Sequence, residues 1–164
     1  SHDVQRIEVM GNDAIVVGND RQDLKFTSIK LAQFATPAST YTQADAVQGD
    51  HRTHGFFYRP SDEFQGVVGL PVLSSGGASV MFLKNNRLRL TSLGKLDSKA
   101  SSRIDDACKA SCVDWYGNAR PIFIGDRAYA LMGYELVEGR FVNGKVREQR
   151  RVNFAPRDAV EIAD

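Results

Sequence analysis

Two histidines are the side chains of this sequence best placed to do chemistry. His51 and His54 lie three residues apart, and carboxylates occur nearby at Asp45, Asp50 and Asp62. Imidazole and carboxylate groups can together hold a divalent metal ion, so one hypothesis is a metal-dependent enzyme centred on the two histidines. On a strand, however, an offset of three places side chains on opposite faces. The alternative is structural, with His51 bonding within a turn and His54 half-buried at a strand entrance.

The two cysteines, Cys108 and Cys112, are separated by three residues. We favour a short-range disulfide, which would indicate an oxidising compartment. Two free thiols are the alternative. A zinc site is least favoured, because a closed site needs four ligands and the sequence has no further cysteine.

Three aromatic side chains could bind a ligand by stacking. Trp115 and Tyr116 are adjacent, and Tyr58 lies in an aromatic run. Aromatic faces of this kind can stack on sugars, so a carbohydrate- or envelope-binding module is a further hypothesis. The structural alternative is that the single tryptophan anchors an interface between β-sheet units.

A basic cluster near the C-terminus could meet an acidic protein partner. It contains Arg147, Arg150 and Arg151, and it is diluted by Glu138 and Glu148. The alternative is an edge strand protected from aggregation by its charges.

No motif of catalysis accompanies these residues. The sequence contains no Gly-x-Ser-x-Gly elbow, no glycine-rich phosphate loop and no calcium-binding loop of the Asp-x-Asp-x-Asp-Gly type. We therefore assign no catalytic residue, no cofactor beyond the possible metal, and lean against an enzyme.

Composition is that of an ordinary globular chain. Of 164 residues, 42% are hydrophobic, and 21 basic residues against 20 acidic ones give a net charge of +1. This balance gives no electrostatic reason to expect nucleic acid as a partner, and no apolar run approaches the length of a membrane span. Ser1-His2 resembles a remnant of tag removal. We expect a single domain over residues 3–155 and a frayed tail over 156–164. The sequence leaves open that the chain is part of a longer protein.

Alternating apolar and polar residues, broken by turn residues, predict β-strands throughout. We expect three antiparallel meanders near 4–31, 53–94 and 112–154. They are joined by a linker over 32–49, with a helical turn near 41–47, and a crossover over 95–110. The middle unit starts with a hairpin around Pro60, and Asn143-Gly144 is the strongest hairpin turn.

The first and third units share a pattern. Gly11-Asn12-Asp13 and Gly125-Asp126-Arg127 each follow an apolar residue and precede Ala and a buried run. Three meanders of about 40 residues predict β-propeller blades. A ring needs at least about four blades, so we expect open sheet faces that other segments would cover. A β-sandwich or barrel is the alternative.

Several of these segments resemble one family. The run Asp50–Pro60, then Gly69-Leu70-Pro71-Val72, then Ile124-Gly125-Asp126-Arg127 with the apolar strand after it, are similar to secreted bacterial proteins with a C-terminal β-propeller distantly related to WD repeats. The resemblance implies a propeller and a periplasmic, cell-surface or extracellular location, and no established activity. Thr53-His54-Gly55 and the Cys108–Cys112 loop depart from the family pattern. The expected function is a non-catalytic binding or scaffold module that docks a protein partner or completes a ring with other propeller segments.

Overall fold

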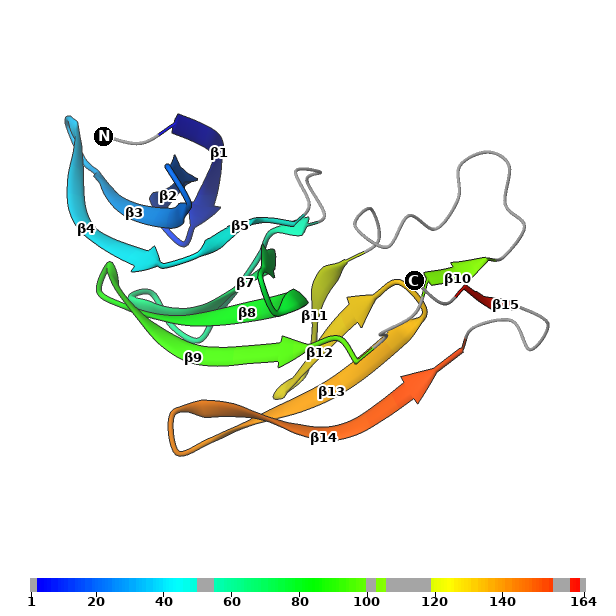
Figure 1. Cartoon of the computed structure of the whole chain (residues 1–164). Helices are drawn as coiled ribbons and strands as arrows, with labels where there is room; N and C mark the ends of the chain where they lie inside the picture. The colour runs from blue at the N-terminus through cyan, green and yellow to red at the C-terminus, as the bar shows by residue number, and fades with distance from the viewer. Residues whose placement is uncertain (1–2, 50–54, 100–102, 106–118, 155–159, 163–164) are drawn as a thin grey trace.

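The chain consists of β-strands in every part that can be described. The computed structural model describes residues 3–49, 55–99, 103–105, 119–154 and 160–162, with side chains for all but the two three-residue segments. These residues contain no α-helix, and most of them form three antiparallel sheets of four or five strands (Figure 1). The prediction of an all-β chain of antiparallel meanders is confirmed.

The first sheet is a four-stranded meander. Its strands, in spatial order, are β1 (Asp3–Met10), β2 (Asp13–Asp20), β3 (Asp23–Leu31) and β4 (Ala35–Gln43). Alternation along β2 and β3 turns Ile15, Val17, Leu24 and Phe26 toward the rest of the molecule, where all four are fully buried.

The second sheet has five strands. They are β5 (Ala46–Gln48), β6 (Phe57–Pro60), β7 (Gln65–Ser74), β8 (Gly77–Asn86) and β9 (Arg89–Asp97). Both β5 and β6 pair with β7, each along a different part of its length. The long strands β7 and β8 are buried on both faces, which explains why their sequences are almost continuously apolar.

The third sheet is again a four-stranded meander. Its strands are β11 (Arg120–Ile124), β12 (Arg127–Met132), β13 (Glu135–Val142) and β14 (Lys145–Asn153). A separate pair joins β10 (Arg103–Asp105) to β15 (Val160–Ile162). β15 lies within the tail expected over residues 156–164, so three residues of that segment form a strand.

The three sheets stack face to face with the second in the middle (Figure 1). The last strands follow one another along one side of the stack, since β4 contacts β9 and β9 contacts β14. On the other side β6 contacts both β1 and β11. The three sheets therefore run in the same direction across the stack, with their last strands on one side and their first strands on the other, as the blades of a propeller do.

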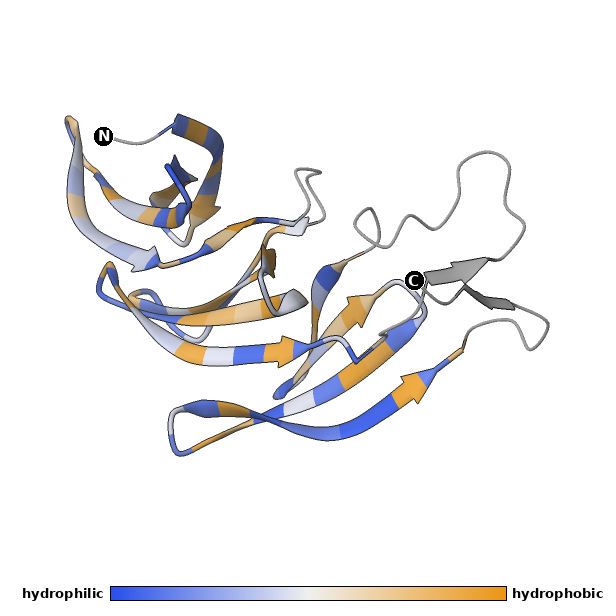
Figure 2. Cartoon of the chain, viewed as in Figure 1, coloured by the Kyte–Doolittle hydropathy of each residue, from blue (hydrophilic) through white to orange (hydrophobic). Residues whose placement is uncertain are grey.

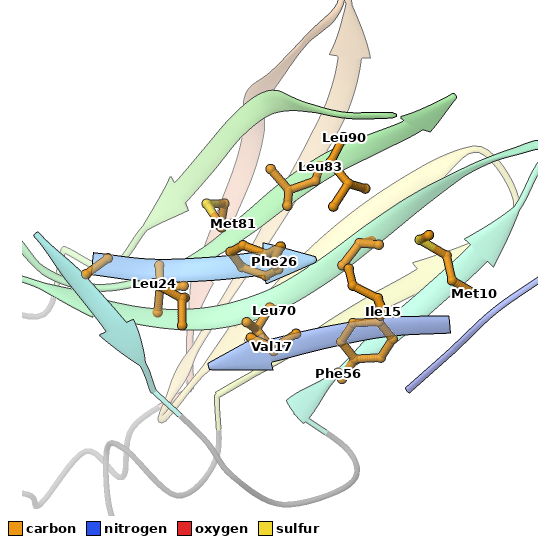
Figure 3. Close-up of a cluster of buried hydrophobic side chains, with 13 residues drawn as sticks. Met10, Ile15, Val17, Leu24, Phe26, Phe56, Leu70, Met81, Leu83 and Leu90 are labelled. Atoms are coloured by element: carbon orange, nitrogen blue, oxygen red, sulfur yellow. The ribbon is translucent and has the colours of Figure 1, made fainter. Parts of the chain in front are cut away.

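Two apolar cores hold the stack together. The core between the first and second sheets contains Ile15, Val17, Phe26, Leu70 and Leu83, among others (Figure 3). The core between the second and third sheets is built around Phe82, Met132 and Val137, and around ring contacts of Phe82 with Phe123 and Phe141. The central sheet thus supplies side chains to both cores.

The expected linker over 32–49 is instead largely strand. Both β4 and β5 lie within it, and the expected helical turn is a tight β-turn in which Asp45 has a φ of 50°. β4 is an edge strand rich in Thr, Ser and Ala with an exposed surface, so it lacks the apolar alternation that marks a strand. Pro37 is accommodated because it lies on this edge beside a register shift in β3.

Other boundaries also moved. The sequence Asn85-Asn86 predicts a hairpin turn at these two residues, but the chain turns at Arg87 and Leu88, with φ of 50° and 67°. A left-handed leucine is unusual. Here the Asn85 side chain accepts a hydrogen bond from the Leu88 N–H at 2.9 Å and caps the turn. The apolar run over 128–136 predicts one continuous strand, but it is divided at Gly133-Tyr134 between β12 and β13. The expected crossover from residue 95 starts only after β9 ends at Asp97.

Candidate binding surfaces

Most of the chemically distinctive residues of the sequence fall outside the described part of the chain. This holds for His51 and His54, for Cys108 and Cys112, and for Trp115 and Tyr116. The metal site, the disulfide and the tryptophan platform therefore stay predictions. Within the described residues, no group of three or more His, Cys, Asp or Glu side chains is arranged to hold a metal ion.

Tyr58 is held in the fold by its neighbours. Its hydroxyl accepts a hydrogen bond from the Asn85 side-chain amide at 3.1 Å, and the ring packs over Gly66, where a side chain would collide with it. Burial raises the pKa of Tyr58 above its ordinary value, although the bond from Asn85 opposes the shift. Tyr58 borders a hollow of about 440 Å³ together with Phe56 and Phe57. Its hydroxyl is thus already engaged in joining β6 to β8.

Arg151 belongs to a charge network inside the molecule. Its guanidinium contacts the carboxylates of Glu135 and Glu148, each at 2.9 Å. It also donates to the backbone carbonyl of Asp97 at 2.8 Å. Arg151 therefore fastens β14 to β9 and does not belong to the exposed basic cluster.

Glu135 is the centre of this network. It is only 4% exposed, and burial by itself opposes its ionisation. Hydrogen bonds from Ser98, Arg151 and the backbone N–H of Lys99 outweigh burial and lower the pKa of Glu135. The carboxylate is therefore kept charged and ties the end of β9 to the third sheet.

Arg147 and Arg150 do lie on an open surface. They project from β14 on the side of the third sheet that faces away from the core, which we call the basic face. The face carries Arg120, Ile122, Ile124, Arg127, Tyr129, Leu131, Leu136, Glu138, Arg140, Arg147, Arg150 and Val152. Arg147 stands directly opposite Arg140 in the register of β13 and β14. Two of the three arginines of the predicted basic cluster thus lie on this face, and their binding to a partner stays a prediction.

The outer face of the first sheet, at the other end of the stack, has uncharged residues on its paired strands. The side of the first sheet that faces away from the core, which we call the apolar face, carries Ile7, Val9, Ala14, Val16, Thr27, Ile29, Pro37 and Thr40. Ile7 and Val9 are 66% and 73% exposed. At its margin Lys25 forms an ion pair with Asp20. Figure 2 shows apolar residues along β1 at this end of the molecule.

The apolar face was not identified from the sequence, although a signal was present. In β1, Ile7 and Val9 alternate with Arg6 and Glu8, which would normally direct the apolar pair inward. A register shift lies between Val4 and Arg6, and Arg6 is the buried side chain, with its guanidinium 6.0 Å from the Phe56 ring centre. The apolar pair is consequently left outside.

Two further hollows lie around the turns that follow β2 and β4. The first, of about 600 Å³, is lined by Arg21, Asp45 and Leu73, among others. The second adjoins it and adds Asp20 and Asp23. These last two carboxylates already have partners, because Asp20 pairs with Lys25 and Asp23 accepts the N–H of Asp45. These carboxylates therefore serve to hold the turns together, and we assign no ligand to the two hollows.

Comparisons with known proteins do not extend this description. No protein-family model, curated protein or solved structure matched the chain. The described residues include no helix whose length and hydropathy would allow it to cross a membrane.

Proposed function

We propose that this chain is a non-catalytic binding module of the β-propeller type, whose apolar face docks against a further β-sheet. The observation that carries the proposal is the exposure of Ile7 and Val9, which lie on the edge strand β1 beside the uncharged residues Val16 and Ala14 of β2. The sheet that covers this face would come from a protein partner or from other propeller segments.

The stack itself supports the proposal. Each internal interface is made by one sheet laid on the next, in the same sense each time. The apolar face has the same kind of composition as the faces that are covered, with β-branched and other apolar side chains at its centre. Burying such a surface is favourable in proportion to its area, and a contiguous exposed apolar patch marks an interaction site.

The proposal extends to where the protein acts. The resemblance of the segments around Pro60, Pro71 and Ile124 to secreted bacterial propellers supports an exported bacterial protein. There the module would serve as a scaffold or a docking unit at the cell surface, in the periplasm or outside the cell.

The test is whether the apolar face drives association when no other partner is present. Sedimentation velocity over a range of concentrations should show that the wild-type chain associates and that Ile7→Lys shifts it to the monomer. Val142→Lys is the matched control, since it makes the same kind of change at an exposed site on the third sheet. A wild-type chain that stays monomeric at every concentration would overturn the proposal.

A further inference from the structure

We infer that the basic face binds an acidic polypeptide segment, at a site separate from the apolar face. This inference goes beyond the proposed docking of a β-sheet, because it concerns the other end of the stack and holds whatever covers the first sheet.

Charge on this face is not balanced within the described part of the chain. Arg127 is paired with Glu138, with 3.1 Å between Nη1 and Oε1. No carboxylate of the described residues lies within ion-pair distance of Arg140, Arg147 or Arg150. With Arg120, which lies opposite Leu131 on the same face, five arginines therefore share this face with a single glutamate. Carboxylates from outside would supply the missing negative charge.

The cross-strand register makes the imbalance sharper. Arg140 and Arg147 are directly opposite each other on β13 and β14. Directly opposed like charges destabilise a sheet, so this pair costs the free protein stability that a bound carboxylate would restore. Guanidinium groups bind carboxylates with two parallel hydrogen bonds. Two neighbouring guanidiniums can thus hold one or two acidic side chains.

A hollow beside these arginines suits an apolar side chain of the same segment. It has a volume of about 210 Å³ and lies between Tyr129, Leu136 and Val152, with Arg127 and Arg150 beside them. An extended peptide in which acidic and apolar side chains follow each other would match both features. A nucleic acid or polyphosphate would leave the apolar lining unused and would bring phosphate close to Glu138.

The inference can be tested with a defined probe. A fluorescein-labelled peptide of alternating Glu and Leu should bind the wild-type chain saturably in fluorescence anisotropy, and more weakly as salt is raised. Arg147→Glu should weaken binding by about tenfold or more, because it removes a charge-assisted contact and adds repulsion. Arg89→Glu is the control, because it makes the same change at an exposed arginine at the start of β9. Arg89 lies next to the turn that contacts the first sheet, where the Leu88 carbonyl accepts a hydrogen bond from Ser39.

A second comparison, between peptides and polyphosphate, distinguishes a polypeptide partner from a polyanion that binds by charge alone. An all-Glu peptide of equal length should bind more weakly than the Glu-Leu peptide, because it leaves the hollow empty. The inference is overturned if Arg89→Glu weakens binding as much as Arg147→Glu, if polyphosphate displaces the peptide at equal charge concentration, or if no saturable binding is seen. These outcomes are independent of the Ile7→Lys result, which tests the apolar face.

Discussion

The first and third sheets are both four-stranded meanders that pack on the same central sheet, yet their outer faces have different chemistry. On the apolar face, Ile7 and Val9 of the edge strand β1 lie beside Val16 and Ala14 of β2, and none of these residues is charged. The basic face mixes apolar side chains with five arginines. The difference indicates that the two ends of the stack meet different partners, since an arginine-rich face would lose hydration against an uncharged one without gaining a counter-charge.

Their inner faces differ too. The first sheet is held mainly by apolar packing, whereas the third sheet adds the network of Glu135, Arg151 and Ser98. The two interfaces should therefore respond differently to substitution and to pH. Four substitutions test this contrast, and their expected effects on the free energy of unfolding decrease from one to the next.

Phe26→Ala should be the most damaging change, because Phe26 is fully buried between the first and second sheets. Removing a buried aromatic ring leaves a cavity and costs about 3 to 5 kcal/mol. Ile7→Ala, on the outer face of the same sheet, should change the free energy of unfolding by less than about 0.5 kcal/mol. Urea denaturation of both variants measures the contrast. Equal losses would mean that the apolar face is already covered within the chain.

Glu135→Gln should destabilise the third-sheet side by about 2 to 3 kcal/mol at neutral pH, because a buried charged acceptor with three donors is lost. Its folded-state pKa is lowered, so its stabilisation is complete above the ordinary glutamate pKa and disappears as pH falls through the folded value. The stability of wild type and variant should therefore converge in acid. Denaturation curves from pH 7 down to pH 3 would show this, and a constant gap would contradict it.

Gly69→Ala should cost about 1 to 3 kcal/mol. A Cβ at Gly69 would lie 2.5 Å from the Cβ of Pro121, so the second and third sheets could not approach as closely. Gly77→Ala makes a poor comparison, because Gly77 has a φ of 96°. Gly76→Ala is a better control, with its nearest atom at 3.8 Å and no such φ. Thermal unfolding should separate the two variants by several degrees.

Arg147→Glu should raise stability slightly, by about 0.5 kcal/mol, since it converts the opposed Arg140–Arg147 pair into an attractive one. The same change should weaken binding of the acidic peptide by about tenfold or more. Opposite signs for folding and binding would show that the arginines serve the partner and not the fold. A loss of stability with unchanged binding would assign them to the fold instead.

Strands with a clear apolar pattern, either alternating or continuous, could be predicted from the sequence, whereas the exposed or very short strands could not. β7 and β8 are almost continuously apolar, and Asn143-Gly144 is a strong turn signal. β4 was missed because an exposed edge strand needs no buried side. Its neighbour β5 is only three residues long, too short for periodicity to show.

The candidate site was only partly predictable, for a related reason. Composition identified the cluster of Arg147, Arg150 and Arg151, but only the fold could show that Arg151 turns inward to Glu135. The apolar face depended on the register between β1 and β2, in which Arg6 lies opposite the buried Val17 and Ile7 lies opposite Val16. The alternation of Ile7 and Val9 with Arg6 and Glu8 does not show which of the two sides faces the core.

The most direct test of the account is the mass of the native particle. Native mass spectrometry of the wild-type chain beside Ile7→Lys counts the chains that associate through the apolar face. The account predicts particles of more than one chain for the wild type and a folded single chain for the variant. A wild-type chain that is single, folded and identical to the variant would contradict it, because the exposed face of the first sheet would then have no tendency to be covered.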